Sequence, residues 1–192
     1  MRIGVLASQG AFAEHIALLH QLESEALPVR LAKELDNLDG LIVPGGESTS
    51  IGKLMADYNL TSEIKRLAKG GLPIFGTCAG MILMARGSSP SDTRLLKLMD
   101  IKVRRNAFGR QKDSFEAELE IPVLGEKLFP GVFIRAPVIE QANNGVEILA
   151  RLTDGTIVAA RQGKLLVSSF HPELTRDSRF HQYFLDIISG SR

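Results

Sequence analysis

The sequence predicts a three-layer, doubly wound α/β fold of the flavodoxin-like type, built on a mostly parallel sheet. In the first half, short apolar runs alternate with stretches of helical periodicity, and parallel neighbours require such crossover connections. In the second half, short apolar runs follow one another between Gly, Asn and Asp turn residues, a pattern typical of antiparallel strands. We therefore expect the second half to extend the same sheet with antiparallel strands.

The first half supplies the parallel part. Residues 2–7 form an apolar run that predicts a buried strand, and Phe12, Ile16 and Leu19 follow it at helical spacing. Further strands are expected at residues 26–31, 39–43 and 72–77, and further helices at residues 48–58, at residues 61–68 and from residue 78 onward. Strands and helices thus alternate along most of this half.

The second half is expected to be rich in strands. They are predicted at residues 113–121, 131–141, 145–152, 156–163 and 164–172. Residues 86–94 are polar and are interpreted as a surface loop, and residues 178–189 carry one apolar face that predicts a closing helix. Because the sequence has no repeat, low-complexity tract or linker, we interpret residues 1–192 as a single domain.

Composition narrows the classes of function. The 23 basic and 22 acidic residues leave a formal charge of +1, which argues against nucleic acid or an anionic membrane surface as a partner. A single cysteine cannot form an intramolecular disulfide, and the apolar run at the N-terminus is too short for a signal peptide or a membrane span. We therefore expect a cytoplasmic protein that binds a small neutral or zwitterionic ligand.

The only cysteine lies in a motif with a known mechanical role. Gly76-Thr77-Cys78-Ala79-Gly80 is the thiol form of the G-x-S-x-G turn, which holds a nucleophile at the carboxyl edge of a parallel sheet. A helix N-terminus also stabilises a thiolate. A lone cysteine is otherwise usually a small buried apolar residue. The motif makes Cys78 the candidate nucleophile.

A base for this thiol is indicated near the C-terminus. His171 ends an apolar run and precedes Pro172, which favours an extended backbone at His171. Because residues two apart in an extended segment share a face, Glu173 can lie beside the imidazole and fix its tautomer. On its own such a segment is an ordinary strand end. The other three histidines, His15, His20 and His181, are interpreted as surface or packing residues.

A third segment completes the predicted site. The strand at residues 39–43 is followed by Pro44, Gly45 and Gly46, whose backbone can approach a ligand closely. Together with the N–H of Ala79, the N–H groups of Gly45 and Gly46 are candidates for an oxyanion hole. Cys and His residues are too few and too scattered for a zinc site, so no metal and no bound cofactor are expected.

These motifs carry a family resemblance. The stretches PGGEST, GTCAGMILMA and HPE resemble the triad class of glutamine amidotransferases. With QGAFAEH, RRNAFGRQKDSFEAEL, FIRAP and SSFHPELTRDSRFHQYF, the chain looks like the glutaminase subunits of pyridoxal 5'-phosphate synthases. The likeness runs from the first predicted strand to the last helix.

The resemblance implies roles for particular residues. It implies Cys78 as nucleophile, His171 as general base and acid, and Glu173 as the residue that orients His171. It further implies an L-glutamine site, whose residues would be Gly46, Glu47, Ser48, Arg105, Ile134 and Arg135. The implied partner is the synthase subunit, a (β/α)₈ barrel that receives the ammonia, with QGAFAEH among the contact segments.

Two other classes of function use the same features. A stand-alone γ-glutamyl hydrolase or a cysteine peptidase would employ the same turn and triad without passing ammonia to a partner. A non-catalytic binding or scaffold domain would keep the same turn around the cysteine but would not catalyse a reaction. Enhanced reactivity of Cys78 toward a glutamine-mimicking electrophile separates an enzyme from an inert domain, and ammonia incorporation by a partner separates the two enzymes.

Overall fold

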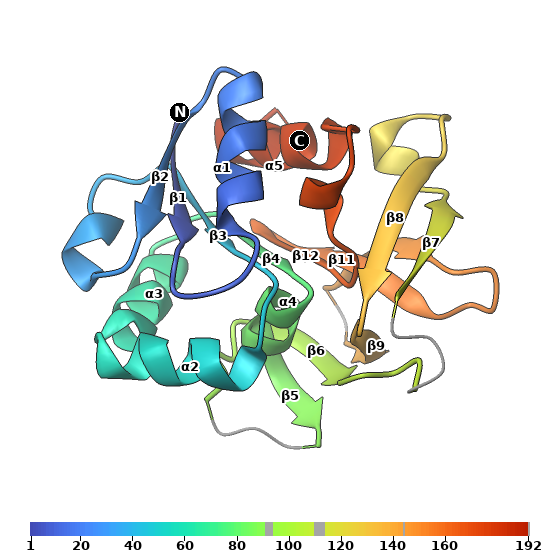
Figure 1. Ribbon diagram of the computed structural model, residues 1–192, viewed down its shortest axis with the longest axis horizontal. Helices are drawn as coiled ribbons and strands as arrows, with labels where there is room; N and C mark the ends of the chain where they lie inside the picture. The colour runs from blue at the N-terminus through green and yellow to red at the C-terminus, as the bar shows by residue number, and fades with distance from the viewer. Residues whose placement is uncertain (91–93, 110–113, 144, 192) are drawn as a thin grey trace.

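A ten-stranded mixed sheet runs through the molecule, and helices cover both of its faces (Figure 1). The computed structural model describes residues 1–90, 94–109, 114–143 and 145–191. The strands are β1 (Arg2–Leu6), β2 (Glu25–Val29), β3 (Gly40–Val43), β4 (Ile74–Thr77), β5 (Ala85–Ser89), β6 (Met99–Arg104), β7 (Ser114–Leu119), β8 (Phe129–Ile134), β9 (Val138–Ala142), β10 (Glu147–Arg151), β11 (Ile157–Gln162) and β12 (Leu165–Ser168). The helices are α1 (Phe12–Gln21), α2 (Ser48–Asp57), α3 (Leu60–Lys69), α4 (Ala79–Met84) and α5 (Arg179–Ser189), with 3-10 turns η1 (Ala32–Leu35), η2 (Pro122–Leu124) and η3 (Pro172–Leu174).

The sheet has a parallel part and an antiparallel part. Its order is β2-β1-β3-β4-β12-β11-β9-β6-β5, and β10 pairs with β11 beside this path. From β2 to β12 every neighbouring pair is parallel, whereas β11 and β9 are antiparallel to the strands beside them. The predicted doubly wound sheet with an antiparallel extension in the second half is therefore confirmed.

Two local predictions were wrong. The strand expected at residues 131–141 is in fact β8 and β9, and only β9 joins the main sheet, because β8 pairs with β7 in a separate two-stranded sheet that also holds the strand expected at residues 113–121. The alternating burial of β7 and β8 explains this, since a ribbon with one polar face can lie over the core as an outer layer. Part of the loop expected at residues 86–94 is instead strand β5, and residues 91–93 lie outside the described residues. An edge strand needs only backbone hydrogen bonds, so its polar sequence gave no signal.

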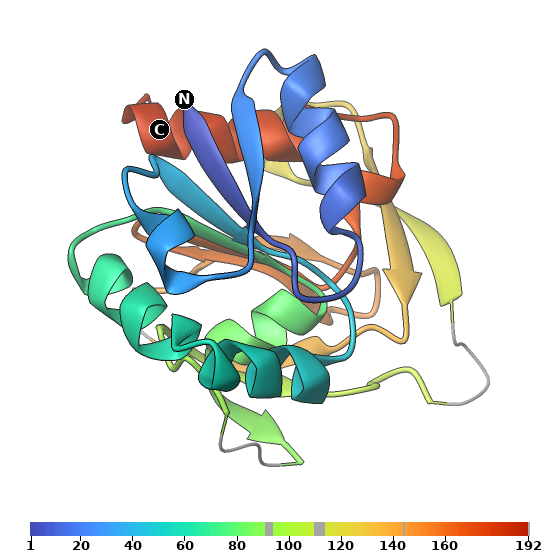
Figure 2. The ribbon, with the colours of Figure 1, turned by 60° about the vertical axis from the view of Figure 1, so that its left-hand side comes forward.

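Alternate residues of each central strand face two different cores. Helices α1 and α5 cover one face of the sheet, and α2, α3 and α4 cover the other (Figure 2). In β3, Ile42 packs on the side of α1 and α5, whereas Leu41 and Val43 pack on the opposite side. Because both faces are covered, β3 and β4 are buried along their whole length and read as continuous apolar runs.

None of the helices in the described ranges approaches the length of a membrane span. The longest, α5, has 11 residues, about half of the roughly 20 that a bilayer requires.

The turn from β4 to α4 depends on close backbone approach. A Cβ atom on Gly80 would lie 1.9 Å from the carbonyl oxygen of Val43, and one on Gly76 would lie 2.7 Å from the Gly80 carbonyl carbon. No other residue can therefore occupy these positions without moving β3 or α4. The glycines set how closely α4 packs against the carboxyl ends of the strands.

We predict that Gly80→Ala lowers the free energy of unfolding by at least about 1–3 kcal/mol, because the added methyl group collides with backbone rather than with a movable side chain. Gly87→Ala is the matched control. A Cβ there has its nearest neighbour at 3.8 Å, so a change within about 0.5 kcal/mol is expected. Urea unfolding measures both, and equal stability of the two variants would contradict the packing account.

Candidate active site

Three segments of the chain meet at one edge of the sheet. Strands β3, β4 and β12 are parallel neighbours, so their carboxyl ends lie side by side. Residues 44–47 follow β3, Cys78 follows β4, and residues 169–173 follow β12. Such an edge is where doubly wound sheets place their ligands. The fold thus gathers the three segments that the sequence singled out.

Cys78 occupies the sharp turn at this edge. Its backbone dihedral angles are φ 48° and ψ −101°, a conformation that a non-glycine residue rarely adopts. Its N–H donates to the Ser168 carbonyl at 2.8 Å, and its Sγ lies 3.8 Å from the Ile134 carbonyl oxygen. The residue as a whole is 7% exposed. Strands β12 and β8 therefore hold the cysteine in a strained, nearly buried position.

His171 and Glu173 form a buried pair beside the thiol. The imidazole Nδ1 lies 2.7 Å from Oε1 of Glu173. Burial acts to lower the pKa of His171, but its contacts with Cys78 and Glu173 outweigh burial and raise that pKa to about 10. Burial acts to raise the pKa of Glu173, and its contacts with the imidazoles of His15 and His171 outweigh burial and lower it. Nδ1 therefore donates to an ionised carboxylate.

A glycine makes room for the imidazole. A Cβ on Gly45 would lie 2.4 Å from Cε1 of His171 and 3.4 Å from Cβ of Cys78. Any side chain at this position would displace the histidine. The close approach of the segment after β3 thus decides where His171 lies relative to Cys78.

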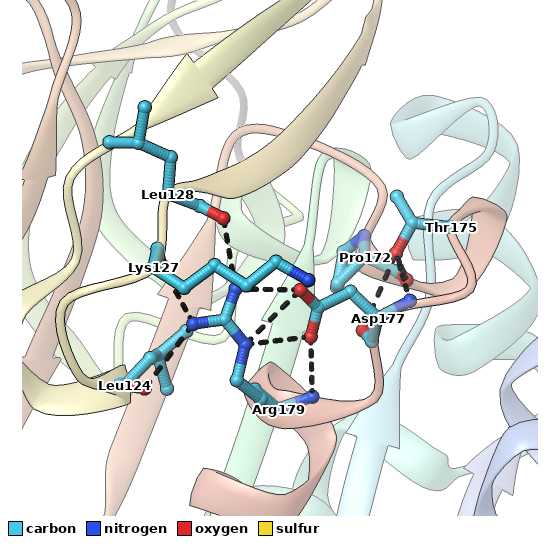
Figure 3. Close-up of polar contacts among 7 residues, drawn as sticks. All are labelled: Leu124, Lys127, Leu128, Pro172, Thr175, Asp177 and Arg179. Carbon is cyan, nitrogen blue, oxygen red and sulfur yellow. Dashed lines mark hydrogen bonds and ion pairs between the residues drawn. The ribbon is translucent and has the colours of Figure 1, made fainter.

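An arginine holds the segment that follows the pair (Figure 3). Arg179 donates to both carboxylate oxygens of Asp177 and to the carbonyl oxygens of Leu124, Lys127 and Leu128. The Thr175 hydroxyl donates to the Pro172 carbonyl at 3.1 Å. These bonds tie the turn after Glu173 to the start of α5 and to the segment before β8. Several charge-assisted hydrogen bonds in one place fix the backbone that carries the pair.

A pocket of about 250 Å³ opens beside Cys78. This volume lies below the range typical of drug-sized ligands and fits a small molecule. Its lining residues are Gly46, Glu47, Ser48, Cys78, Ala79, Ile82, Arg105, Asn106, Ile134, Arg135 and His171. The structure therefore brings together all six residues expected around glutamine. Glu173 and Gly45 lie behind this lining.

Two opposite charges stand at the pocket. The Glu47 carboxylate accepts hydrogen bonds from the N–H groups of Thr49 and Ser50 at 2.9 and 2.7 Å and so caps the N-terminus of α2. The hydroxyl hydrogen bond from Ser50 is the main cause that lowers the pKa of Glu47 to about 2. The guanidinium of Arg105 lies 3.7 Å from this carboxylate. The pocket thus offers an anion and a cation, as a zwitterionic ligand requires.

The N–H groups expected to form the oxyanion hole differ in whether they already donate a hydrogen bond within the protein. The N–H of Gly45 donates to the Thr77 hydroxyl at 3.0 Å and is therefore occupied. The Gly45 carbonyl oxygen faces Gly10, where a Cβ would lie 1.8 Å from it. Gly46, with φ 153°, and Ala79 both line the pocket. To join an oxyanion hole, the Gly45 N–H would have to leave the Thr77 hydroxyl.

Sequence reasoning missed several residues of the site. Ile82 and Asn106 line the pocket and were not expected there. Of the histidines interpreted as surface or packing residues, His20 is exposed, whereas His15 and His181 are completely buried behind the His171–Glu173 pair. The signal for His15 was available, because it shares a helical face with the buried Leu18 and Leu19.

No group of three or more metal-binding side chains is present in the parts of the chain that the structure describes.

We predict that the stability supplied by the buried pair depends on pH. The pKa of His171 is raised from 6.5 to about 10, so its contribution is complete below about pH 6.5 and is lost as the pH rises toward 10. The pKa of Glu173 is lowered, so its contribution is present above its ordinary 4.5 and is lost in acid. The difference in unfolding free energy between the parent and His171→Gln should shrink from pH 6.5 to 10. Urea unfolding across this range measures it, and a constant difference would contradict the assignment.

Comparisons with known proteins agree with this geometry. The pyridoxal 5'-phosphate synthase subunit PdxT of Moorella thermoacetica is 58% identical over 98% of this chain and 100% of its own length. The protein of the same name from Dehalococcoides mccartyi is 56% identical over 97% of both chains. A solved structure of a glutamine amidotransferase superposes with a TM-score of 0.92 at 49% identity and covers 98% of this chain and all of its own. The resemblance expected from the motifs is thereby confirmed. Residues 5–189 match a single family model, and the chain belongs to the SNO glutamine amidotransferase family.

Proposed function

We propose that this chain is the glutaminase subunit of a pyridoxal 5'-phosphate synthase and that it hydrolyses L-glutamine to L-glutamate and ammonia. The observation that carries the proposal is that Cys78 and His171 line a small pocket with opposite charges, while Glu173 lies behind the lining and is hydrogen-bonded to His171. The relatives named as PdxT, at 50–58% identity, support the assignment to that synthase.

The triad accounts for amide hydrolysis in two steps. The Cys78 thiolate attacks the side-chain carbonyl carbon of glutamine, and protonated His171 gives its proton to the departing nitrogen, which leaves as ammonia. Water then attacks the γ-glutamyl thioester, and His171 takes a proton from that water. The C–S bond breaks, glutamate leaves and the thiolate is regenerated. Glu173 holds the Nδ1 proton throughout, so Nε2 is the atom that exchanges protons.

The pocket accounts for recognition of an α-amino acid. Arg105 or Arg135 supplies a cation for the α-carboxylate, and Glu47 supplies an acceptor for the α-ammonium. Gly46, Ser48 and Ile134 complete the glutamine site. We assign the chain a single domain, residues 1–192, in which the two cores share one sheet and the site lies at its edge.

Completing the oxyanion hole requires a change in the backbone conformation at Gly45. Ala79 and Gly46 line the pocket, so their N–H groups can face the developing negative charge. Gly45 joins them only after its N–H leaves the Thr77 hydroxyl. Glycines allow such a peptide rotation at little steric cost. We infer that this rotation accompanies docking of the synthase subunit and that it limits glutamine hydrolysis in the isolated chain.

Ammonia is best transferred directly to the partner. In water near neutral pH it would be protonated and so unreactive as a nucleophile, which favours a contact sealed against solvent. The proposed receiver is the synthase subunit, a (β/α)₈ barrel. Residues 9–15, at the start of α1, are assigned to the contact, because the loop that begins at Gln9 lies beside the segment after β3, and the Gln9 side chain accepts a hydrogen bond from Glu47 N–H.

The triad assignment predicts that Cys78→Ala abolishes glutamine hydrolysis while the fold persists, because a small residue at a helix start has little effect on stability. His171→Asn should reduce kcat by about 10²- to 10⁴-fold, the usual contribution of a positioned acid-base group. A glutamate-release assay measures both. His20→Asn, at an exposed position of α1, is the control and should match the parent. A folded Cys78→Ala variant that is as active as the parent would overturn the mechanism.

The partner assignment predicts weak glutaminase activity in the isolated chain and a clear increase when the synthase subunit is added. Size-exclusion chromatography should show one complex that contains both proteins. Full activity of the chain alone, together with separate elution, would instead favour a stand-alone γ-glutamyl hydrolase or cysteine peptidase.

A further inference from the structure

Two histidines that the mechanism does not use lie directly behind the triad. Nδ1 of His15 is 2.8 Å from Nε2 of His181, and both side chains are completely buried. Nε2 of His15 is 3.3 Å from Oε2 of Glu173 and 3.3 Å from the Thr77 hydroxyl. A continuous row of polar groups therefore leads from α5 through α1 to the carboxylate of the pair.

One carboxylate oxygen of Glu173 needs a polar neighbour. Its Oε1 accepts from His171, whereas Oε2 is buried and accepts no hydrogen bond from the residues that the structure describes. A buried carboxylate oxygen without a partner is strongly unfavourable. The imidazole of His15, at 3.3 Å, is the group that faces it.

One arrangement of protons gives Oε2 of Glu173 a facing donor. If Nε2 of His15 carries the proton, it presents a positive N–H to the carboxylate, and its Nδ1 accepts the N–H from Nε2 of His181. Nδ1 of His181, which has no partner among the described residues, is then an unprotonated nitrogen rather than a buried, unpaired N–H. The opposite tautomers would place a lone pair against the carboxylate.

The surroundings favour two neutral imidazoles. Burial is the main cause that lowers the pKa of His15, opposed by the charges of Glu173 and Glu14 and aided by that of His171. Burial, followed by the neighbouring His15, lowers the pKa of His181 well below its ordinary value. Neutral rings can each donate one proton and accept another, as the row requires.

We propose that His15 is a positioning residue for the triad, whose Nε2–H faces both Oε2 of Glu173 and the Thr77 hydroxyl while His181 fixes its tautomer. The proposal rests on the triad of the proposed function. With a positive N–H facing Oε2, the carboxylate keeps Oε1 directed at Nδ1 of His171, and the other ring nitrogen of His171 stays directed at Cys78. The same His15 N–H reaches the Thr77 hydroxyl, which accepts the N–H of Gly45.

Kinetics of position 15 variants test this role, measured with the synthase subunit present. His15→Phe keeps a ring but removes the N–H, and kcat should fall about 10- to 100-fold, as for the loss of a hydrogen bond to a charged group. KM should stay within about twofold, because neither buried histidine lines the glutamine pocket. His15→Gln, whose amide reaches the position of Nε2, should recover most of the loss. His15→Asn reaches only the position of Nδ1 and should not.

Position 181 supplies an independent test, because its variants leave His15 in place. His181→Phe should lower kcat less than His15→Phe does. The double variant should be no slower than His15→Phe alone, since both residues act along one row. His20→Phe on the same helix is the matched control and should leave kcat unchanged.

Several outcomes would overturn the proposal. Parent kcat in His15→Phe or, if that variant does not fold, in His15→Asn would exclude positioning by this N–H. Equal losses in His15→Gln and His15→Asn, or a parallel rise in KM and loss of unfolding free energy, would show a packing role instead. These results leave the proposed function intact as long as Cys78→Ala is inactive, whereas an active Cys78→Ala variant would reject the triad itself.

Discussion

The hydrogen bond between His171 and Glu173 is the interaction on which the rest of the site depends. It joins two groups that are nearly inaccessible to water, at 2.7 Å. Burying an ionised carboxylate and an imidazolium is unfavourable unless each has close partners. The surrounding structure supplies them: Cys78 on one side of the pair and His15 on the other. The site is therefore a row of mutually dependent polar groups rather than three isolated side chains.

Close backbone packing is what lets these groups meet. Gly45 leaves space for the imidazole, Gly80 lets α4 approach β3, and Gly10 leaves space for the Gly45 carbonyl. Each of these glycines faces a backbone atom or the imidazole of His171 at close range. A side chain at any of the three positions would collide with that group. The strained backbone of Cys78 belongs to the same arrangement, because the turn must be sharp to leave the thiol at the edge of the sheet.

In the proposed function, the pocket can bind glutamine while the oxyanion hole is still incomplete. Glu47 and Arg105 already place opposite charges at the pocket. The Gly45 N–H, however, is bound to Thr77, a residue that also contacts His15. Helix α1 thus carries His15, which is proposed to support the triad, and at its start the segment proposed for the partner contact. Binding of a partner there would act on the same group of residues that positions the catalytic pair.

The sequence alone predicted the doubly wound sheet, its antiparallel extension and the positions of Cys78, His171 and Glu173. Apolar runs, helical periodicity and glycines at the ends of strands are local signals, and the rule that parallel strands share a carboxyl edge converts them into a place for the site. The six residues expected around glutamine came from motif resemblance and lie in one pocket.

Tertiary structure alone decided the rest. Whether β7 and β8 pair with each other or with the main sheet, and whether residues 85–89 form an edge strand, depends on backbone pairing that side-chain polarity does not specify. Which histidines support Glu173 depends on how α1 and α5 cross the same face of the sheet, and residues 15, 173 and 181 are too far apart in sequence for periodicity to relate them. The hydrogen bond from the Gly45 N–H to Thr77 likewise depends on the orientation of one peptide group. Local pattern fixes the elements and the motifs, whereas contacts between distant segments are set only when the two cores pack on the sheet.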